Sequence, residues 1–235
     1  MTRLISFLAH AVYMGTPLLF GTVGEIQNEK AGHLNLGVEG TMAMGACAGF
    51  MVAYKTGSLW LSILAAFLMG ALVSLIYAFL TITMMANQNV TGLTLTIFGT
   101  GLSNFIGEQM ISASPTGNLK LPDGVMSSLK NIDIPLLSKI PVLGEVLFSQ
   151  NIFTYLSIVI AVIMFIYLKK TKVGLNLRTI GENPAVADAV GISVVKYKYI
   201  NVLIGGGICG IGGAFCSMVI LSLIHISEPT RRRGI

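Results

Sequence analysis

The sequence predicts an all-α membrane protein, a polytopic bundle of about six transmembrane helices. Of its 235 residues, 54% are hydrophobic and 11% are charged, whereas soluble domains carry about 25% charged residues. The mean hydropathy is +0.79. Six apolar runs each approach or exceed the roughly 20 residues that a helix needs to cross a bilayer. Together these observations exclude an ordinary soluble domain.

The six apolar runs are separated by polar intervals of different length. In chain order they are Leu4–Val23, Leu34–Tyr54, Leu59–Met85, Val90–Ile111, Ile152–Leu168 and Tyr199–Leu221. The interval Ser112–Asn151 is rich in proline, which favours an ordered, turn-rich cap rather than a helix. We expect the first run to be a membrane span and not a cleaved signal peptide, because no small-residue cleavage pattern follows it.

Basic residues set the expected orientation of these spans. They flank the interval 169–198 and outnumber its acidic residues, so the positive-inside rule places that interval in the cytoplasm. Counting back from it puts Ser112–Asn151, Lys55–Ser58 and the N-terminus outside, and Ala86–Asn89 and Glu25–His33 inside. Because the net charge of +5 is explained by such flanks and by three terminal arginines, we expect no nucleic-acid partner.

Small residues recur at helical spacing in two of the runs. Gly37, Thr41, Gly45 and Gly49 follow one another every four residues, and Gly206, Gly210 and Ala214 do the same in the sixth run. Stripes of this kind allow two helix backbones to approach closely. We expect close helix packing there, rather than a solute path lined by glycine.

Polar residues inside the spans are the candidates for a pathway. Glu39 lies in the second run, with Asn35 four residues before it and therefore on the same helical face. A carboxylate at membrane depth is costly, so Glu39 is expected to face the bundle interior and to have a partner. It acts either as a structural clamp or in translocation. Asn87, Gln88, Thr91 and Thr94 make a polar entry to the fourth span, where Asn89 or Thr91 is expected to cap the helix.

The interval 169–198 contains a short helix with clear ends. Asn183 can cap the first free N–H groups, Pro184 is tolerated at the first helical position, and Gly191 stops the helix. The mostly apolar residues between them form a helix too short to be stable alone in water. A short capped helix on the cytoplasmic face of a membrane bundle is predicted to be a docking element.

Motifs of enzymes are missing. The chain has no P-loop and no hydrolase constellation, so it is expected not to be an enzyme, and any ATP must be bound by another chain. Cys47, Cys209 and Cys216 lie in apolar runs without metal-ligand spacing. We therefore expect no catalytic residues, no metal and no cofactor of its own.

Four segments of the chain resemble one family, the permeases of bacterial ATP-binding cassette (ABC) importers for simple sugars and nucleosides, a group that includes the ribose permeases. The nucleoside branch is the most similar. The matching segments, in family order, are GEIQNEKAGHLNLGVEG (Gly24–Gly40), NQNVTGLTL (Asn87–Leu95), IPVLGEVLFSQ (Ile140–Gln150) and GLNLRTIGENPAVADAVGIS (Gly174–Ser193).

The resemblance implies residue roles and partners. Arg178–Ile192 would form the coupling helix that lies in a groove of the ATPase subunit. A second permease, identical or paralogous, and an extracytoplasmic substrate-binding lipoprotein would complete an importer in the bacterial plasma membrane. The coupling residues would be Arg178, Gly181, Glu182, Asn183, Pro184, Ala187, Asp188, Val190 and Gly191. The family signature NxGxEG falls on Asn35, Gly37, Glu39 and Gly40.

Two alternatives stay open at this stage. An ion-coupled secondary transporter of a small polar solute needs carboxylates in the membrane, and Glu39 alone supports it. A membrane scaffold without transport is the other.

The end of the chain departs from the family. Members of the family continue with further spans, whereas here SLIHISEPTRRRGI (Ser222–Ile235) follows the sixth run. This tail resembles translated adapter sequence, so we expect residues 222–235 to be non-native and residues 1–221 to be the permease domain of a C-terminally truncated fragment.

Overall fold

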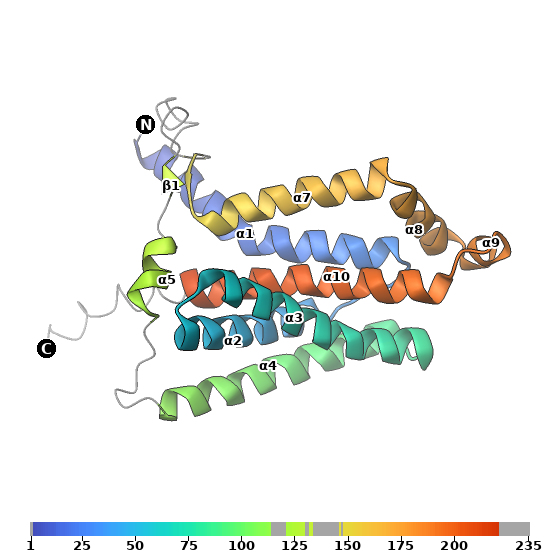
Figure 1. Ribbon diagram of the computed structural model, residues 1–235, viewed down its shortest axis with the longest axis horizontal. Coiled ribbons are helices and arrows are strands. Elements are labelled where there is room, and N and C mark those ends of the chain that lie inside the picture. Colours follow the sequence, from blue (N-terminus) through green and yellow to red (C-terminus); the bar gives the residue numbers. More distant parts are fainter. Residues whose placement is uncertain (1, 114–120, 130–131, 134–145, 147, 221–235) are drawn as a thin grey trace, which may run out of the picture.

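A computed structural model describes residues 2–113, 121–129, 132–133, 146 and 148–220. Long helices run side by side in a bundle (Figure 1). The helices and strands are α1 (Thr2–Lys30), α2 (Val38–Thr56), α3 (Leu59–Ala78) with the π-helical turn η1 (Phe79–Thr83), α4 (Gln88–Ala113), α5 (Asp123–Ser128), β1 (Ile132–Asp133), β2 (Ser149–Gln150), α7 (Ile152–Lys170), α8 (Lys172–Glu182), α9 (Pro184–Ala189) and α10 (Val194–Phe215) with η2 (Cys216–Ile220).

The predicted class, a polytopic helical membrane protein, is confirmed. Within the described residues, four helices are long and apolar enough to cross a membrane: Leu4–Lys30, Leu59–Thr83, Ile152–Lys170 and Val194–Ile220. The helices α2 and α4, of 19 and 26 residues, fall short in apolarity. Both carry charged and polar side chains, which neighbouring helices must satisfy in a bilayer. The count of six spans stays a prediction.

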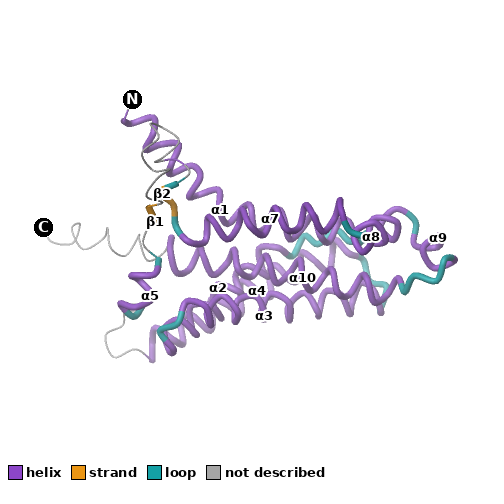
Figure 2. Tube along the Cα trace, turned by 45° about the horizontal axis from the view of Figure 1, so that its top comes forward, coloured by secondary structure: helices purple, strands orange, loops and turns teal. Residues whose placement is uncertain are grey.

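The helix α10 forms the centre of the bundle. It packs against α1, α2 and α3, and 78% of its apolar window is buried, against 28% to 33% in the other candidate spans. A Cβ added to Gly45 of α2 would lie 2.5 Å from the Cα of Gly210. The small-residue stripes therefore bring α2 and α10 into backbone contact, as predicted. Figure 2 shows the same arrangement from another direction.

Two predicted boundaries were wrong at the start of the chain. The first helix continues past Val23 to Lys30, because Gly24, Gln27 and Asn28 still lie buried inside the bundle. The second helix begins at Val38 and not at Leu34. Asn35 therefore lies in the turn before α2, and it does not share a helical face with Glu39.

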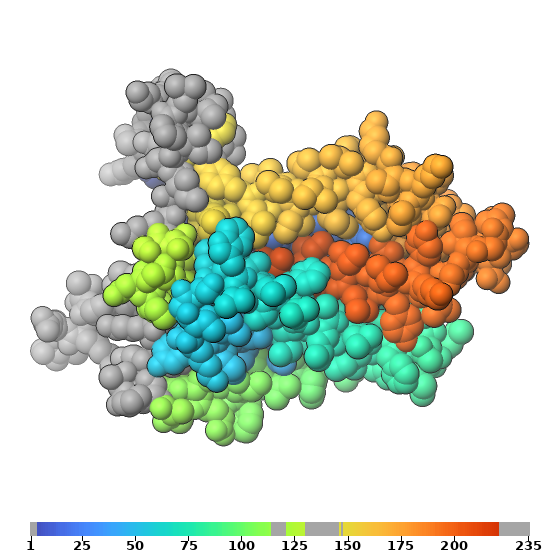
Figure 3. All heavy atoms as spheres, in the orientation of Figure 1, coloured from blue at the N-terminus to red at the C-terminus, as the bar shows by residue number. Residues whose placement is uncertain are grey.

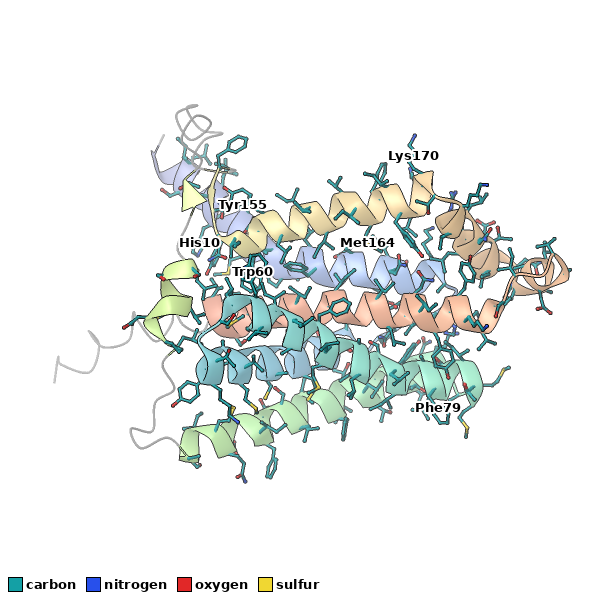
Figure 4. All side chains as sticks on the ribbon, in the orientation of Figure 1. His10, Trp60, Phe79, Tyr155, Met164 and Lys170 are labelled. Atoms are coloured by element: carbon teal, nitrogen blue, oxygen red, sulfur yellow. The ribbon has the colours of Figure 1, made fainter. Side chains whose placement is uncertain are left out.

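The predicted outer interval is only partly described. Contrary to the expectation of a cap without helix, Asp123–Ser128 forms the short helix α5, and β1 pairs antiparallel with β2. Pro115, Pro135, Pro141 and the tail Ser222–Ile235 lie outside the described residues. Figure 4 places Trp60 at the α5 end of the bundle and Lys170 at the opposite end, beside α8.

Candidate functional site

The segment between α7 and α10 folds as two helices. Asn183 separates them with an extended backbone (φ −149°, ψ 94°), and its Oδ1 accepts a hydrogen bond from the N–H of Val186 at 3.3 Å. Pro184 is at the first position of α9, and Gly191 follows the helix with a positive φ of 81°. The predicted start and stop are confirmed. The single helix Arg178–Ile192 is wrong, because an extended residue followed by proline interrupts it.

The helix α8 connects this segment to the bundle. It is amphipathic, with Leu177 and Ile180 fully buried. Gly181 lies against the end of α1, because a Cβ added there would be 2.5 Å from the carbonyl oxygen of Lys30. Gly32, with a φ of 79°, also contacts Gly181: its own added Cβ would be 3.3 Å from the Cα of Gly181. The helix α8 is thus in close backbone contact with the end of α1 and the turn after it.

The helix α9 extends beyond the end of the bundle (Figure 1). Ala187 is buried, whereas the side chains of Val186 and Val190 are 51% and 68% exposed. Glu182 and Asp188 are also exposed. Arg178 on α8 is half-buried, and its Nε has no hydrogen-bond partner among the described residues. Exposed valines on a charged, protruding helix are typical of a surface that another protein covers.

The signature residues form a second site, at the turn between α1 and α2. We call residues 31–37 the signature turn. The backbone N–H of Asn35 donates to Glu25 Oε1 at 2.7 Å, and Asn35 Oδ1 accepts from the N–H of Gly37 at 2.9 Å. Glu25 Oε2 also accepts from Asn28 Nδ2 at 3.0 Å. These bonds fix the turn on the last helical turns of α1.

The start of α4 lies against the same turn. Gln88 Oε1 accepts from the N–H of Leu34 at 2.9 Å, and the Thr96 hydroxyl donates to the carbonyl of Leu36 at 2.9 Å. Gly40 allows the contact, since a Cβ there would lie 2.7 Å from the Cα of Thr96. The two sequence motifs, Gly24–Gly40 and Asn87–Leu95, therefore meet in one site.

The other polar residues predicted at the start of the fourth span differ in burial. Thr91 is buried, and Thr94 is exposed, its hydroxyl donating to the carbonyl of Val90 at 2.8 Å. Asn87 is the cap, because its Oδ1 accepts from the N–H groups of Asn89 and Val90. The expected caps, Asn89 and Thr91, lie two and four residues after the observed one, since α4 begins at Gln88.

Glu39 does not face the interior of this chain. It lies in the first turn of α2 with an exposed side chain. The carboxylate that holds the signature turn is Glu25, which the sequence pattern assigned to a loop. One signal pointed to it: Phe20, Gly24 and Asn28 follow one another every four residues, so the face of the first helix that carries Phe20 continues past Val23.

A buried polar network links α1, α7 and α10. The side-chain amide of Gln27 donates to Asn201 Oδ1, the Tyr167 hydroxyl donates to the same oxygen at 3.0 Å, and Asn201 Nδ2 donates to the carbonyl of Tyr197 at 2.7 Å. Gln27 and Asn201 are buried. Neither residue was predicted from the sequence, because Gln27 lies in the expected loop Glu25–His33 and Asn201 is a single amide in an apolar run.

His33 lies in the signature turn, close to this network. It is buried, its ring meets that of Tyr77 edge to face at 6.4 Å, and neither ring nitrogen has a hydrogen-bond partner among the described groups. Burial, and secondarily the charge of Lys198, lowers the pKa of His33 to about 4. His33 is therefore neutral at pH 7.

The described residues contain no group of three or more histidine, cysteine, aspartate or glutamate side chains that could hold a metal ion. Their three cysteines are free thiols. The two sites thus offer helix surfaces and hydrogen bonds, with no catalytic constellation.

Comparison with known proteins gives consistent relatives. The chain is 34% identical over 223 residues to the putative glucose ABC transporter permease TsgC13 of Haloferax volcanii, covering 95% of this chain and 65% of the relative. It is 33% identical to the nucleoside ABC transporter permease NupC of Lactococcus lactis, covering 94% and 69%. It is 34% identical to the guanosine ABC transporter permease NupQ of Bacillus subtilis, covering 95% and 71%. No solved structure matches the chain.

These relatives confirm the resemblance found from the four segments, and they are longer than the chain, which spans about two thirds of their length. A family model described as "Branched-chain amino acid transport system / permease component" matches residues 7–226. The chain, a multi-pass membrane protein by its apolar helices, therefore belongs to this family of transport-system permease components.

Proposed function

We propose that this chain is a permease subunit of an ABC importer and forms part of the translocation pathway for nucleosides or simple sugars in the bacterial plasma membrane. The family supports the subunit type. The substrate class follows the relatives, two of which are named for nucleosides or guanosine and one for glucose.

The observation that carries the proposal is the helix α9. It is capped at both ends, protrudes from the bundle and exposes Val186 and Val190. In our proposal α9 lies in a groove of the separate ATPase subunit, which binds the ATP. Closure of the ATPase then moves α8, and the contact of Gly181 with Lys30 and Gly32 passes this movement to the signature turn.

In our proposal the solute passes along the exposed surface of α2 and α4, which we call the open face. Glu39 of α2 and Thr94, Asn104 and Glu108 of α4 are exposed there. Polar groups are costly in hydrocarbon, so this face is expected to meet a second permease subunit, identical or paralogous, with the solute passing between the two. The signature turn lies at the inner end of both helices, where it can change their distance or tilt.

An extracytoplasmic lipoprotein would deliver the solute to the end of the bundle that carries α5. The C-terminal ends of α2 and α4 lie at the same end of the bundle as α5, which supports a receiving surface there (Figure 1). Prolines of the predicted outer interval precede and follow α5 in the sequence.

Uptake into membrane vesicles tests the function. Inside-out and right-side-out vesicles would contain the chain together with its ATPase, partner permease and binding lipoprotein, with labelled guanosine and labelled glucose as solutes. We expect uptake that requires ATP and survives collapse of the proton and sodium gradients. Uptake that needs a gradient and ignores ATP would instead establish the ion-coupled transporter.

Sidedness is tested separately in intact cells. Asp188→Cys on α9 should be protected from a membrane-impermeant thiol reagent and should crosslink to the ATPase. Lys55→Cys, at the opposite end of the bundle, is the matched control and should be labelled. Labelling of the position-188 variant from outside would overturn the assignment.

A further inference from the structure

A cavity of about 320 Å³ lies where the end of α7, the start of α8 and the start of α10 come together. Its polar lining comes from Tyr167, Ser193, Lys196, Tyr197 and Asn201. Figure 3 shows α7 and the first turns of α10 on the same face of the molecule, with α1 visible between them. Neither the coupling surface of α9 nor the signature turn includes this cavity.

The floor of the cavity is fixed by hydrogen bonds. Asn201 is buried and is held by Gln27, by the Tyr167 hydroxyl and by the carbonyl of Tyr197. The Tyr197 hydroxyl accepts from Asn176 Nδ2 at 3.2 Å, which leaves its own proton to donate. A ligand would therefore meet a formed polar surface and would not need to order it.

One lysine lines the cavity, and two more lie in the chain segments next to it. Lys196 is exposed and lines it, and Lys170 and Lys172 lie at the adjoining end of α7 and start of α8. Figure 4 shows the side chain of Lys170 directed away from the bundle at this end. Ser193 adds a hydroxyl, which makes no capping bond to α10. None of the lining residues is acidic, so the cavity favours an anion.

The walls of the cavity are apolar. Val173 and Ile200 line it, with side chains 43% and 57% exposed. Next to it, α7 presents the exposed side chains of Ile163 and Ile166, which belong to a candidate membrane span. An amphiphile fits these surroundings. Its anionic head would lie among the lysine and hydroxyl groups, and its hydrocarbon chain would lie along the isoleucines.

We propose that this cavity binds the headgroup of an anionic phospholipid, with Lys196 contacting the phosphate and Ile200 contacting an acyl chain. The lysines place the site in the leaflet next to α8 and α9, which we expect to be the cytoplasmic one. A lipid bound there would touch both α8 and α10, and would thus support the base of the coupling segment.

Native mass spectrometry of the purified, delipidated chain tests the proposal by titration with phosphatidylglycerol and with phosphatidylcholine. We expect preferential retention of phosphatidylglycerol. Lys196→Gln should weaken it about fivefold, the usual effect of one lysine at an anionic lipid surface. Lys55→Gln makes the same charge change at the other end of the bundle and should leave retention unchanged.

Two further arms separate the lipid from a free phosphate ion. Glycerol 3-phosphate and inorganic phosphate are titrated alone, and Ile200→Asn is titrated with phosphatidylglycerol. The proposal expects weak binding of both small anions and reduced lipid binding by the Ile200 variant. Equal retention of the two lipids by the unmodified chain, equal effects of the two lysine variants, or tight binding of phosphate alone would each overturn it. Because Lys196 and Ile200 are exposed, both variants are expected to fold, and circular dichroism checks this.

Discussion

Gly181 of α8 is in backbone contact with Lys30, the last residue of α1: a Cβ on the glycine would lie 2.5 Å from the lysine carbonyl oxygen. This contact joins the segment that carries α9 to the turn that carries Asn35. The two regions are far apart in sequence, and they lie side by side because α8 turns back onto the end of α1.

The first prediction concerns this contact. Gly181→Ala should lower the free energy of unfolding by about 1 to 3 kcal/mol, because the opposing atom belongs to the backbone and must shift. Gly15→Ala is the control, since an added Cβ there has nothing within 4 Å, and alanine at an open helical position stabilises by about 1 kcal/mol. Thermal unfolding in detergent measures both. The two variants are expected to change the free energy of unfolding in opposite directions. A stabilised Gly181 variant would show that the contact is loose.

The second prediction concerns the exposed face of α9. Val190→Asp should leave the stability within about 0.5 kcal/mol, since the side chain is a surface one, but should uncouple uptake from ATP hydrolysis. Ala187→Asp should also abolish uptake, but Ala187 is buried, so that variant also loses stability. The control is Val195→Asp, a valine of similar exposure (56%) outside α9. Normal uptake by the Val190 variant would count against docking through α9.

The third prediction separates two glutamates of α1. Glu25→Ala should lower the free energy of unfolding by about 1 to 3 kcal/mol, because it leaves the N–H of Asn35 and the amide of Asn28 without their acceptor. Glu29→Ala removes an exposed carboxylate from the next turn and should change stability by less than about 0.5 kcal/mol. Chemical unfolding of the two variants in matched micelles gives the comparison. Equal losses would mean that Glu25 does not hold the turn.

The fourth prediction concerns the open face of α2 and α4. Glu39→Gln should reduce uptake more than Glu108→Gln does, with the stability of both variants unchanged, because both side chains are exposed and only Glu39 is next to the signature turn. Initial rates of guanosine uptake at several concentrations measure this. If the rates of the two variants agree, Glu39 has no special place in the pathway.

The fifth prediction is a pH dependence. Because burial lowers the pKa of His33 to about 4, the unfolded chain binds a proton there between pH 6.5 and pH 4 that the folded chain does not. Stability is thus fully present above pH 6.5 and falls as the pH falls, by about 2 kcal/mol between pH 7 and pH 5. His33→Asn should remove this component, whereas His10→Asn, at an exposed position, should retain it. Unfolding midpoints of both variants and of the unmodified chain are compared at pH 7 and pH 5. An equal pH dependence in the two variants would contradict the prediction.

Local rules predicted much of this molecule. The cap at Asn183, the proline at position 184 and the stop at Gly191 depend only on neighbouring backbone groups, so the sequence reveals them. Close packing at the glycine stripes of α2 and α10 follows from the spacing along each helix, although the pairing of Gly45 with Gly210 was not predicted. The two motifs of the second site were also identified, although their meeting through Gln88 and Leu34 was not.

Partners distant in sequence were not predictable in this way. Glu39 and Glu25 are both glutamates near the end of an apolar run, and the sequence does not reveal that Glu25 is half-buried while Glu39 is exposed. The length of α1 depends on its packing against α10, since Gln27 is polar by type and yet completes the core through Asn201. The helix α8 was not predicted, because its amphipathic pattern is short and begins among lysines.

The central position of α10 has a consequence for how the protein is made. The helices that surround α10, namely α1, α2 and α3, all leave the ribosome before it. Until α10 is synthesised, these three helices lack the helix that all of them contact. Their glycine-containing faces are then covered by lipid or by the insertion machinery. The insertion of α10 therefore places a helix in the middle of helices that are already made, and does not add a helix to an outer surface.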